Sequence, residues 1–409
     1  MNKVRMDDIC DFYNGGAWSD KEYVGSGLPV LKVSNCKNSG FRIEEVNFLP
    51  ISLKEKYAKN KLYKGDVIIA TVGSHPNLIE SAAGRSCVVN SLVEGFYLNQ
   101  NAVCLRTKDE EILDQGYLGY LCKERSFQHF IQNKGRGAAN QMRIAIGGIK
   151  EYEFNLPDID IQRRISAILI AYDDLIENNQ KQIKLLEEAA QRLYKEWFVK
   201  LRFPGYEDVA IVNGVPEGWR YKRVEEFGEV ITGKTPSTSK TEYYGGNIPF
   251  VTIPDMHGNV FPLVTEKTLT KVGADTQKNK YLPVNSVIVS CIATVGLVNI
   301  AVEACQTNQQ INSVILQNDN ELYFFYESMK RIKALLDGVG SNGATMTNVN
   351  KTKFSSIKVL YPAEDLVKRY NELCKPIFDK IFALSKSIIK AEQARDRLLP
   401  KLMSGEIKV

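Results

Sequence analysis

The 409-residue sequence lacks several features that mark metal-binding, secreted or membrane proteins. It has only three histidines, and none of its eight cysteines belongs to a Cys-x-x-Cys motif, so we expect no zinc site. The N-terminal residues carry charges without an apolar stretch, so we expect no secretory signal. The longest apolar run, residues 287–302, is too short and too often interrupted to cross a bilayer. These absences predict a cytoplasmic protein with reduced cysteines and no membrane contact.

Catalytic motifs are also missing. We find no GxSxG, no HExxH, no GxGxxG after a strand, and no Asn/Asp-Pro-Pro-aromatic tetrapeptide of the amino-methyltransferases. Residues 228–235 (GEVITGKT) do fit the phosphate-binding pattern GxxxxGK[ST]. However, Pro236 follows at once and disfavours the helix that such a loop must begin. The sequence therefore predicts no catalytic centre.

Composition and charge are those of an ordinary globular chain. Apolar residues make up 44% and charged residues 25%, and the length suits two or three domains. The net charge of +5 is small, and no segment is distinctly basic. Charge alone therefore does not identify a nucleic-acid partner.

The strongest signal is an internal duplication. Residues 4–9 align without gaps with residues 222–227, and the alignment continues to Gly15 and Gly233. Three further matches follow: residues 28–31 with 248–251, 70–73 (ATVG) with 293–296 (ATVG), and 99–100 (NQ) with 308–309 (NQ). At the end of each copy the offset becomes a constant 205 residues. The chain therefore holds two copies of one plan, a variable region followed by a helix.

Each copy ends in a segment that predicts a long helix. Residues 158–200 contain no Pro or Gly, and Pro157 precedes them. Apolar residues alternate at spacings of four and three, which is the heptad pattern of a coiled-coil seam. The predicted seam is Ile165, Leu169, Tyr172, Ile176, Asn179, Ile183, Leu186, Ala190, Leu193 and Trp197, and in the second copy Tyr370, Cys374, Ile377, Ile381, Leu384, Ile388, Ala391, Arg395, Leu398 and Leu402. The two stripes would bury each other, or each helix would pack on its own globular domain.

The variable regions predict mixed α+β domains. Residues 66–73 and 286–290 are β-branched runs typical of strands. Residues 116–132 and 322–337 predict helices, and each is followed by a glycine-rich loop. Residues 203–219 are rich in Pro and Gly and predict a linker between the copies.

Five motifs carry a resemblance to a known family. They are residues 214–219 (GVPEGW), 233–237 (GKTPS), 308–310 (NQQ), 191–198 (QRLYKEWF) and 397–407 (RLLPKLMSGEI). In this order, and with the duplication, the chain resembles the specificity subunit of type I restriction-modification systems over its whole length. The first copy lacks the Pro-x-Gly-Trp opening and the Gly-x-Thr-Pro-Ser turn.

The resemblance implies an α+β fold with two target-recognition domains, residues 1–157 and 204–362. It also implies two spacer helices, residues 158–203 and 363–409, that run antiparallel as a coiled coil with pseudo-two-fold symmetry. The subunit would be non-catalytic and would read a bipartite sequence of double-stranded DNA. It would dock two methylation subunits and then restriction subunits, and these partners would hold S-adenosylmethionine, ATP and Mg²⁺.

Polar side chains on the predicted loops are the candidates for DNA contact, since their groups suit base edges and phosphates. The candidates are Lys32, Asn35, Lys37, His75, Asn77, Arg136, Asn140, Gln141 and Arg143 in the first copy, and Lys234, Thr235, Ser237, Asp255, His257, Asn259, Asn342 and Thr345 in the second.

Two other functions remain open at this point. The chain could be a helical assembly scaffold whose duplicated domains bind peptides. It could also hydrolyse nucleotides through residues 228–235. Salt-dependent binding to duplex DNA would favour recognition, whereas ATP binding that Lys234→Ala abolishes would favour the hydrolase.

Overall fold

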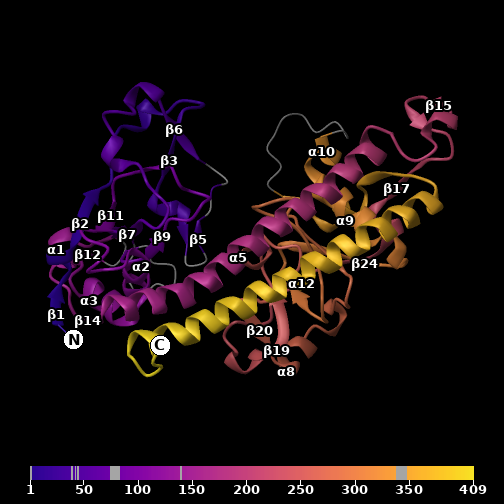
Figure 1. Cartoon of the computed structure of the whole chain (residues 1–409). Helices are drawn as coiled ribbons and strands as arrows, with labels where there is room; N and C mark the ends of the chain where they lie inside the picture. The colour runs from indigo at the N-terminus through magenta and orange to yellow at the C-terminus, as the bar shows by residue number, and fades with distance from the viewer. Residues whose placement is uncertain are drawn as a thin grey trace. The chain divides into compact units, whose positions relative to one another are not determined.

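The computed structural model describes residues 2–37, 40–41, 43, 46–73, 83–138, 141–337 and 348–409. It divides into two compact units, which we call unit 1 (Met1–Leu175 and Ala391–Val409) and unit 2 (Ile176–Lys390). Both chain termini belong to unit 1 (Figure 1). Each unit therefore contains one variable region together with a part of both long helices.

Unit 1 is built on a four-stranded antiparallel sheet of order β2-β11-β7-β9. Three-stranded sheets of order β10-β3-β6 and β12-β13-β8 and the pair β1-β14 complete the main framework. The strands are β1 (Asn2–Arg5), β2 (Cys10–Asn14), β3 (Leu28–Leu31), β4 (Cys36–Lys37), β5 (Gly40–Phe41), β6 (Asn47–Leu49), β7 (Val67–Ala70), β8 (Val72–Gly73), β9 (Ser86–Val88), β10 (Tyr97–Leu98), β11 (Ala102–Thr107), β12 (Arg136–Ala138), β13 (Gln141–Arg143) and β14 (Glu153–Leu156). The short helices are α1 (Met6–Ile9), α2 (Gln115–Lys123), α3 (Arg125–Asn133) and α4 (Ile146–Lys150).

Unit 2 repeats this plan. Its four-stranded sheet has the order β18-β24-β21-β22, its three-stranded sheet the order β20-β19-β23, and β17 pairs with β25. The strands are β15 (Ile211–Val212), β16 (Val215–Pro216), β17 (Arg220–Arg223), β18 (Gly228–Thr232), β19 (Tyr244–Val251), β20 (Lys267–Leu269), β21 (Val287–Ser290), β22 (Val298–Ile300), β23 (Gln306–Thr307), β24 (Ile311–Leu316) and β25 (Lys358–Tyr361). The short helices are α6 (Val224–Phe227), α7 (Ile253–Met256), α8 (Lys271–Asp275), α9 (Leu322–Lys330), α10 (Ile332–Asp337) and α11 (Lys351–Ser355). The predicted duplication and the α+β class are confirmed.

One sequence match was wrong. The ATVG motifs at residues 70–73 and 293–296 do not occupy equivalent positions. Ala70 pairs with Ala102 in unit 1, and its counterpart in unit 2 is Ser290, which pairs with Ile311. The strands β7 and β21 therefore correspond at an offset of 220, and the second ATVG lies three residues beyond the equivalent site.

The predicted helices differ from the structure at their ends. The stretch 116–132 is two helices, because the Glu124 side chain accepts a hydrogen bond from the Ser126 backbone N–H (2.6 Å) and caps a new helix there. The stretch 322–337 likewise divides into α9 and α10. The two long helices are α5 (Ile159–Tyr194), which continues as a π-helical turn over Lys195–Val199, and α12 (Glu364–Met403).

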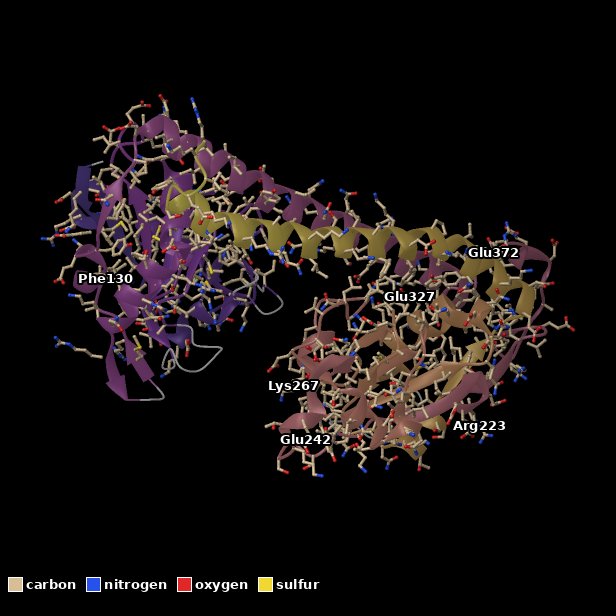
Figure 2. All side chains as sticks on the ribbon, turned by 90° about the horizontal axis from the view of Figure 1, so that it is seen from below. Phe130, Arg223, Glu242, Lys267, Glu327 and Glu372 are labelled. Atoms are coloured by element: carbon tan, nitrogen blue, oxygen red, sulfur yellow. The ribbon has the colours of Figure 1, made fainter. Side chains whose placement is uncertain are left out.

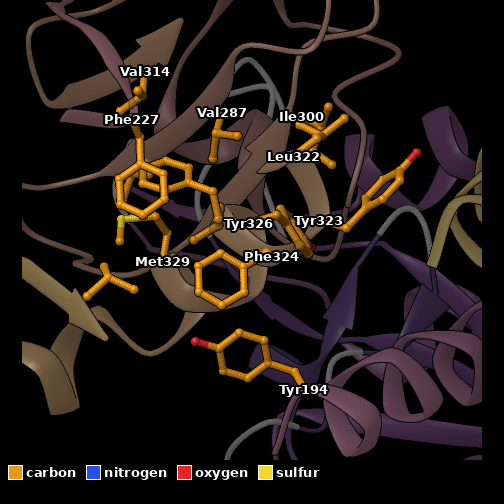
Figure 3. Close-up of a cluster of buried hydrophobic side chains, with 14 of the residues drawn as sticks. Tyr194, Phe227, Val287, Ile300, Val314, Leu322, Tyr323, Phe324, Tyr326 and Met329 are labelled. Atoms are coloured by element: carbon orange, nitrogen blue, oxygen red, sulfur yellow. The ribbon is translucent and has the colours of Figure 1, made fainter. Parts of the chain in front are cut away.

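Every predicted seam residue is at least half-buried. In unit 1, Ile165, Leu169 and Leu402 lie in the same core as Met6 and Phe127 of the globular part. In unit 2, the core contains Ala190, Tyr370, Cys374 and Ile381 beside the aromatic residues of α9. Figure 3 shows the ring of Tyr194 below Phe324 in that core. The long helices therefore share a core with the globular part of each unit.

Polar contacts fix the long helices within each unit. In unit 1, the Asp173 carboxylate of α5 accepts hydrogen bonds from Arg395 Nη1 of α12 (2.5 Å) and from the Tyr120 hydroxyl of α2 (2.7 Å). Burial would raise the pKa of Asp173, but Lys123, Arg395 and Tyr120 hold it below its usual value. In unit 2, Asn179 Nδ2 donates to Ser387 Oγ (3.1 Å). The two polar seam residues, Asn179 and Arg395, therefore each bond to a polar residue of the other long helix.

No described helix combines the length and the apolar composition that crossing a membrane requires.

Glu327 is a buried acid in unit 2, on the side that carries the long helices (Figure 2). Burial is the main cause that raises its pKa to about 7; Lys330 opposes this shift and Glu187 adds to it. A carboxyl whose folded pKa exceeds its unfolded value costs stability as the pH rises through that interval, and the cost is complete above pH 7. We therefore expect Glu327→Gln to stabilise the protein by on the order of 2–4 kcal/mol at pH 8, and by much less at pH 5.

Thermal unfolding at both pH values measures this effect. The control is Glu229→Gln, because Glu229 is an exposed glutamate of the same unit. A gain of equal size at pH 5 and pH 8 would contradict the assignment.

Candidate nucleic-acid interface

The motifs at residues 233–237 and 308–310 meet in unit 2. After β18 the backbone passes directly over the segment that follows β23. A Cβ on Gly233 would lie 2.1 Å from the Asn308 carbonyl oxygen, so only glycine fits there. The Lys234 backbone N–H then donates to the Thr307 carbonyl (2.9 Å). This close crossing explains why two motifs far apart in the sequence occur together.

Unit 1 contains the same crossing. A Cβ on Gly15 would lie 1.9 Å from the Asn99 carbonyl oxygen. The Gly16 N–H donates to the Leu98 carbonyl and the Gln100 N–H to the Gly16 carbonyl, each at 2.8 Å. The counterpart of Lys234 is Gly16, so the backbone is retained while the side chain differs. Both units therefore share a crossing that only glycine allows.

In unit 2 the crossing supports a polar turn. Thr235 Oγ1 donates to Gln309 Oε1 (2.6 Å), and Gln277 Nε2 donates to the Lys234 carbonyl (2.7 Å). Gln277 is buried and also donates to Gln306 Oε1 (2.7 Å). These bonds fix the turn, while the Lys234 side chain is exposed and forms no ion pair with any described residue. The turn therefore presents a cation from a rigid backbone.

The phosphate-loop hypothesis fails on this geometry. Residues 228–232 form β18, which pairs with β24 throughout its length. The residues from Gly233 to Lys240 are not helical, whereas a phosphate-binding loop must lead into a helix N-terminus. Nothing in this segment could cradle a triphosphate in that manner.

Three other predicted residues of unit 2 lie around α7. Asp255 Oδ2 accepts from the backbone N–H and hydroxyl of Thr252 (2.8 and 2.7 Å), and Oδ1 accepts from the Glu266 N–H (2.8 Å). Asn259 is exposed and donates to the Asp255 carbonyl (3.1 Å), while His257 is half-buried. Both carboxylate oxygens of Asp255 therefore accept hydrogen bonds, Oδ2 at the start of α7 and Oδ1 from Glu266. Ser237 is exposed and contacts the Ser239 hydroxyl (2.9 Å).

In unit 1, the predicted residues form two groups. Lys32 lies with its Nζ 4.7 Å from the centre of the Tyr23 ring, and its N–H donates to Asn35 Oδ1 (2.9 Å). Lys37 is exposed on β4. Arg136 and Arg143 are exposed and directly opposite each other on β12 and β13. His75, Asn77, Asn140, Asn342, Thr345 and the side chain of Gln141 lie outside the described part of the chain.

Sequence reasoning did not select Gln277, Gln306 or Gln309. Gln309 could have been chosen, because it belongs to the NQQ motif and aligns with Gln100. Gln277 carries no such signal, because its partner Lys234 is 43 residues away in the sequence. Among the described residues, no group of three or more His, Cys, Asp or Glu side chains could hold a metal ion.

The crossing gives a direct test. We expect Gly233→Ala to destabilise the protein by about 2–4 kcal/mol, since the methyl group would overlap the Asn308 carbonyl and force the backbone apart. Thermal or denaturant unfolding measures the change. The control is Gly147→Ala in α4, where a Cβ would meet no atom within 4 Å. Equal stability of Gly233→Ala and the wild type would show that the two backbone segments at the crossing can move apart at little cost.

Comparison with known proteins agrees with these features. The family model of the type I restriction modification DNA specificity domain matches residues 1–188 and 216–394. The type I restriction enzyme HindI specificity subunit of Haemophilus influenzae is 28% identical, over 86% of this chain and 88% of that protein. A putative MjaX specificity subunit of Methanocaldococcus jannaschii is 25% identical, over 99% and 93% of the two chains. The crystal structure of an S subunit from M. genitalium has a TM-score of 0.58 at 15% identity, covering 98% of this chain and 95% of that one.

The similarity to the M. genitalium structure concerns the fold alone. The family model, in contrast, matches both copies of the repeat. The chain therefore belongs to the type I restriction-modification specificity family, and it is the non-catalytic subunit that recognises the DNA target.

Proposed function

We propose that this subunit reads a bipartite target in double-stranded DNA, with residues 1–157 reading one half and residues 204–362 the other. The observation that supports this most strongly is the shared crossing of Gly15 over Asn99 and Gly233 over Asn308, with different side chains beside it. A common framework with variable polar neighbours suits two readers of different sequences. A single recognition domain would discriminate only weakly between DNA sequences, since a good bidentate base contact is worth about 1–3 kcal/mol.

The DNA contacts proposed are the exposed or half-exposed polar residues of these regions. Lys234, Thr235 and Ser237 have the best structural support in unit 2, because the turn that carries them is fixed by buried glutamines. In unit 1, the proposed DNA contacts come from two segments. One segment contributes Lys32, Asn35 and Lys37, and the other contributes Arg136 and Arg143. Asp255 has the least support, since its oxygens are already bonded. His257, Asn259, His75, Asn77, Asn140, Gln141, Asn342 and Thr345 remain proposals from the sequence.

Residues 158–203 and 363–409 are proposed to form an antiparallel coiled-coil spacer that relates the two recognition domains by a pseudo-two-fold rotation. Contacts within unit 2 support opposite helix directions: Asn179 meets Ser387, whereas Ala190, further along α5, accepts from Tyr370, earlier in α12. The buried stripes with the same register in both helices support the symmetry.

Two methylation subunits are the proposed first partners, with restriction subunits joining them in a cytoplasmic complex. Two copies of one plan offer two equivalent faces, and these suit two identical partners. S-adenosylmethionine, ATP and Mg²⁺ would be held by those partners. The alternative, a scaffold with peptide-binding domains, is not favoured by the family assignment.

We expect the purified chain, combined with its methylation subunits, to bind its target duplex with an affinity that falls steeply as salt rises. The chain alone should transfer no methyl group. Gel-shift titration across salt concentrations, with methylation mapping of the complex, measures both properties. Methylation by the isolated chain, or salt-independent binding of unstructured peptides in place of DNA, would overturn the proposal.

The spacer proposal predicts a ruler. Duplicating the heptad 178–184 in α5 and the heptad 383–389 in α12 keeps the seam in phase, and the added Asn179 equivalent again faces Ser387. Each helix gains about 10 Å at about 1.5 Å per residue. The gap between the half-sites should therefore grow by about three base pairs at about 3.4 Å each, and the bases read should not change.

Methylation mapping of the variant complex measures the gap. Inserting two residues instead rotates the seam by about 200° and should destabilise the helix pair without lengthening the gap. An unchanged gap in the heptad variant, or altered half-site bases, would contradict the ruler.

A further inference from the structure

The hairpin of β12 and β13 brings two arginines together on one face of unit 1. The register places Arg136 directly opposite Arg143, so both side chains emerge on the same side of the hairpin. Both are exposed, and neither forms an ion pair with a described residue. Two positive groups are thus adjacent and uncompensated within the described chain.

The hairpin does not need these charges to fold. Like charges directly opposite each other weaken an antiparallel pair. The register is set by the other face, where Met142 is buried and Gly135 leaves room for its side chain. The strand β13 is also held by β8, through the pairs Met142–Gly73 and Arg143–Val72.

In unit 2, the position equivalent to Arg143 has the same backbone contact but a different side chain. The bridge of Asn348 to Ile292 corresponds to the pair Arg143–Val72. The next backbone bond agrees, since Val349 N–H donates to Cys291 as Ile144 N–H donates to Thr71 (both 2.8 Å). Asn348 is exposed and uncharged. The same strand contact therefore forms without arginine, and the charge in unit 1 serves another purpose.

We propose that Arg136 and Arg143 together clamp one backbone phosphate of the DNA half-site held by unit 1. This rests on the proposed DNA-binding function and assigns the pair to the phosphate backbone in place of the bases. A phosphate brings a negative charge that relieves the repulsion between both guanidinium groups, and its oxygens accept their paired N–H donors. A guanine edge is neutral, so it would leave the repulsion in place. The contact adds affinity and register, and no sequence information.

The test measures the affinity of the complete complex with methylation subunits for target and non-target duplexes across salt concentrations. The variants are Arg143→Asn, which installs the residue of unit 2, Arg136→Gln, and the double variant. Each single variant should weaken binding about tenfold on both duplexes alike. In the double variant, the magnitude of the slope of log affinity against log salt should fall by about 0.9, as for the loss of one phosphate. Because both residues share that phosphate, the double variant should lose less than the product of the single losses.

Arg163→Gln is the charge-matched control, since Arg163 is exposed on α5 and pairs with Glu111 (2.7 Å). It should leave the affinity and the slope unchanged, and all variants should keep the melting temperature of the wild type. A loss confined to target DNA and traced to one base pair would mean guanine reading and would overturn the clamp. Unchanged affinity and slope in the double variant would overturn it as well. Failure of the wild-type complex to bind any duplex would instead refute the proposed function.

Discussion

Burial of the apolar stripes on α5 and α12 is the constraint on which each unit depends. A helix of this length with one apolar face gains its stability from packing, since propensity alone contributes little. In unit 1, Leu169 and Leu402 lie in the core that also contains Met6 and Phe127. In unit 2, Tyr370 and Ile381 join the core around Phe324. Residues 157 and 362, the predicted ends of the two recognition domains, are equivalent positions of the repeat. The hydrophobic cores extend beyond these positions into the long helices.

The second constraint is steric and concerns the crossing in each unit. Gly15 and Gly233 allow one backbone to touch the carbonyl oxygen of another, and any side chain there would collide. The neighbouring residues carry no such restriction. Lys234, for example, has Gly16 as its counterpart. A fixed backbone beside freely variable side chains would let the proposed DNA contacts differ between the two units without loss of the framework.

Sequence reasoning succeeded where the signal was local or repeated. The heptad pattern predicts both long helices, and the duplication links Gly15 with Gly233 and Asn99 with Asn308 from the sequence alone. It missed residues whose role depends on contacts far along the chain, such as Gln277, which donates to the Lys234 carbonyl 43 residues away. Residue type alone also does not reveal that the oxygens of Asp255, a proposed base reader, accept hydrogen bonds from Thr252 and Glu266. The alignment of the two ATVG motifs was wrong because strand pairing, and not residue identity, defines equivalent positions.

The two copies join their long helices to the globular part with different chemistry. In unit 1, Asp173 of α5 binds Arg395 of α12 and Tyr120 of α2. At the repeat offset of 205, the residues equivalent to Asp173 and Arg395 are Phe378 and Ala190. Phe378 stacks on Tyr323 with ring centres 4.3 Å apart. If a helix segment packed on the wrong globular part, Asp173 would lose its cation and be buried among aromatic rings, which is costly. Duplicated segments could otherwise pack on either globular part, and this difference in chemistry disfavours the wrong pairing.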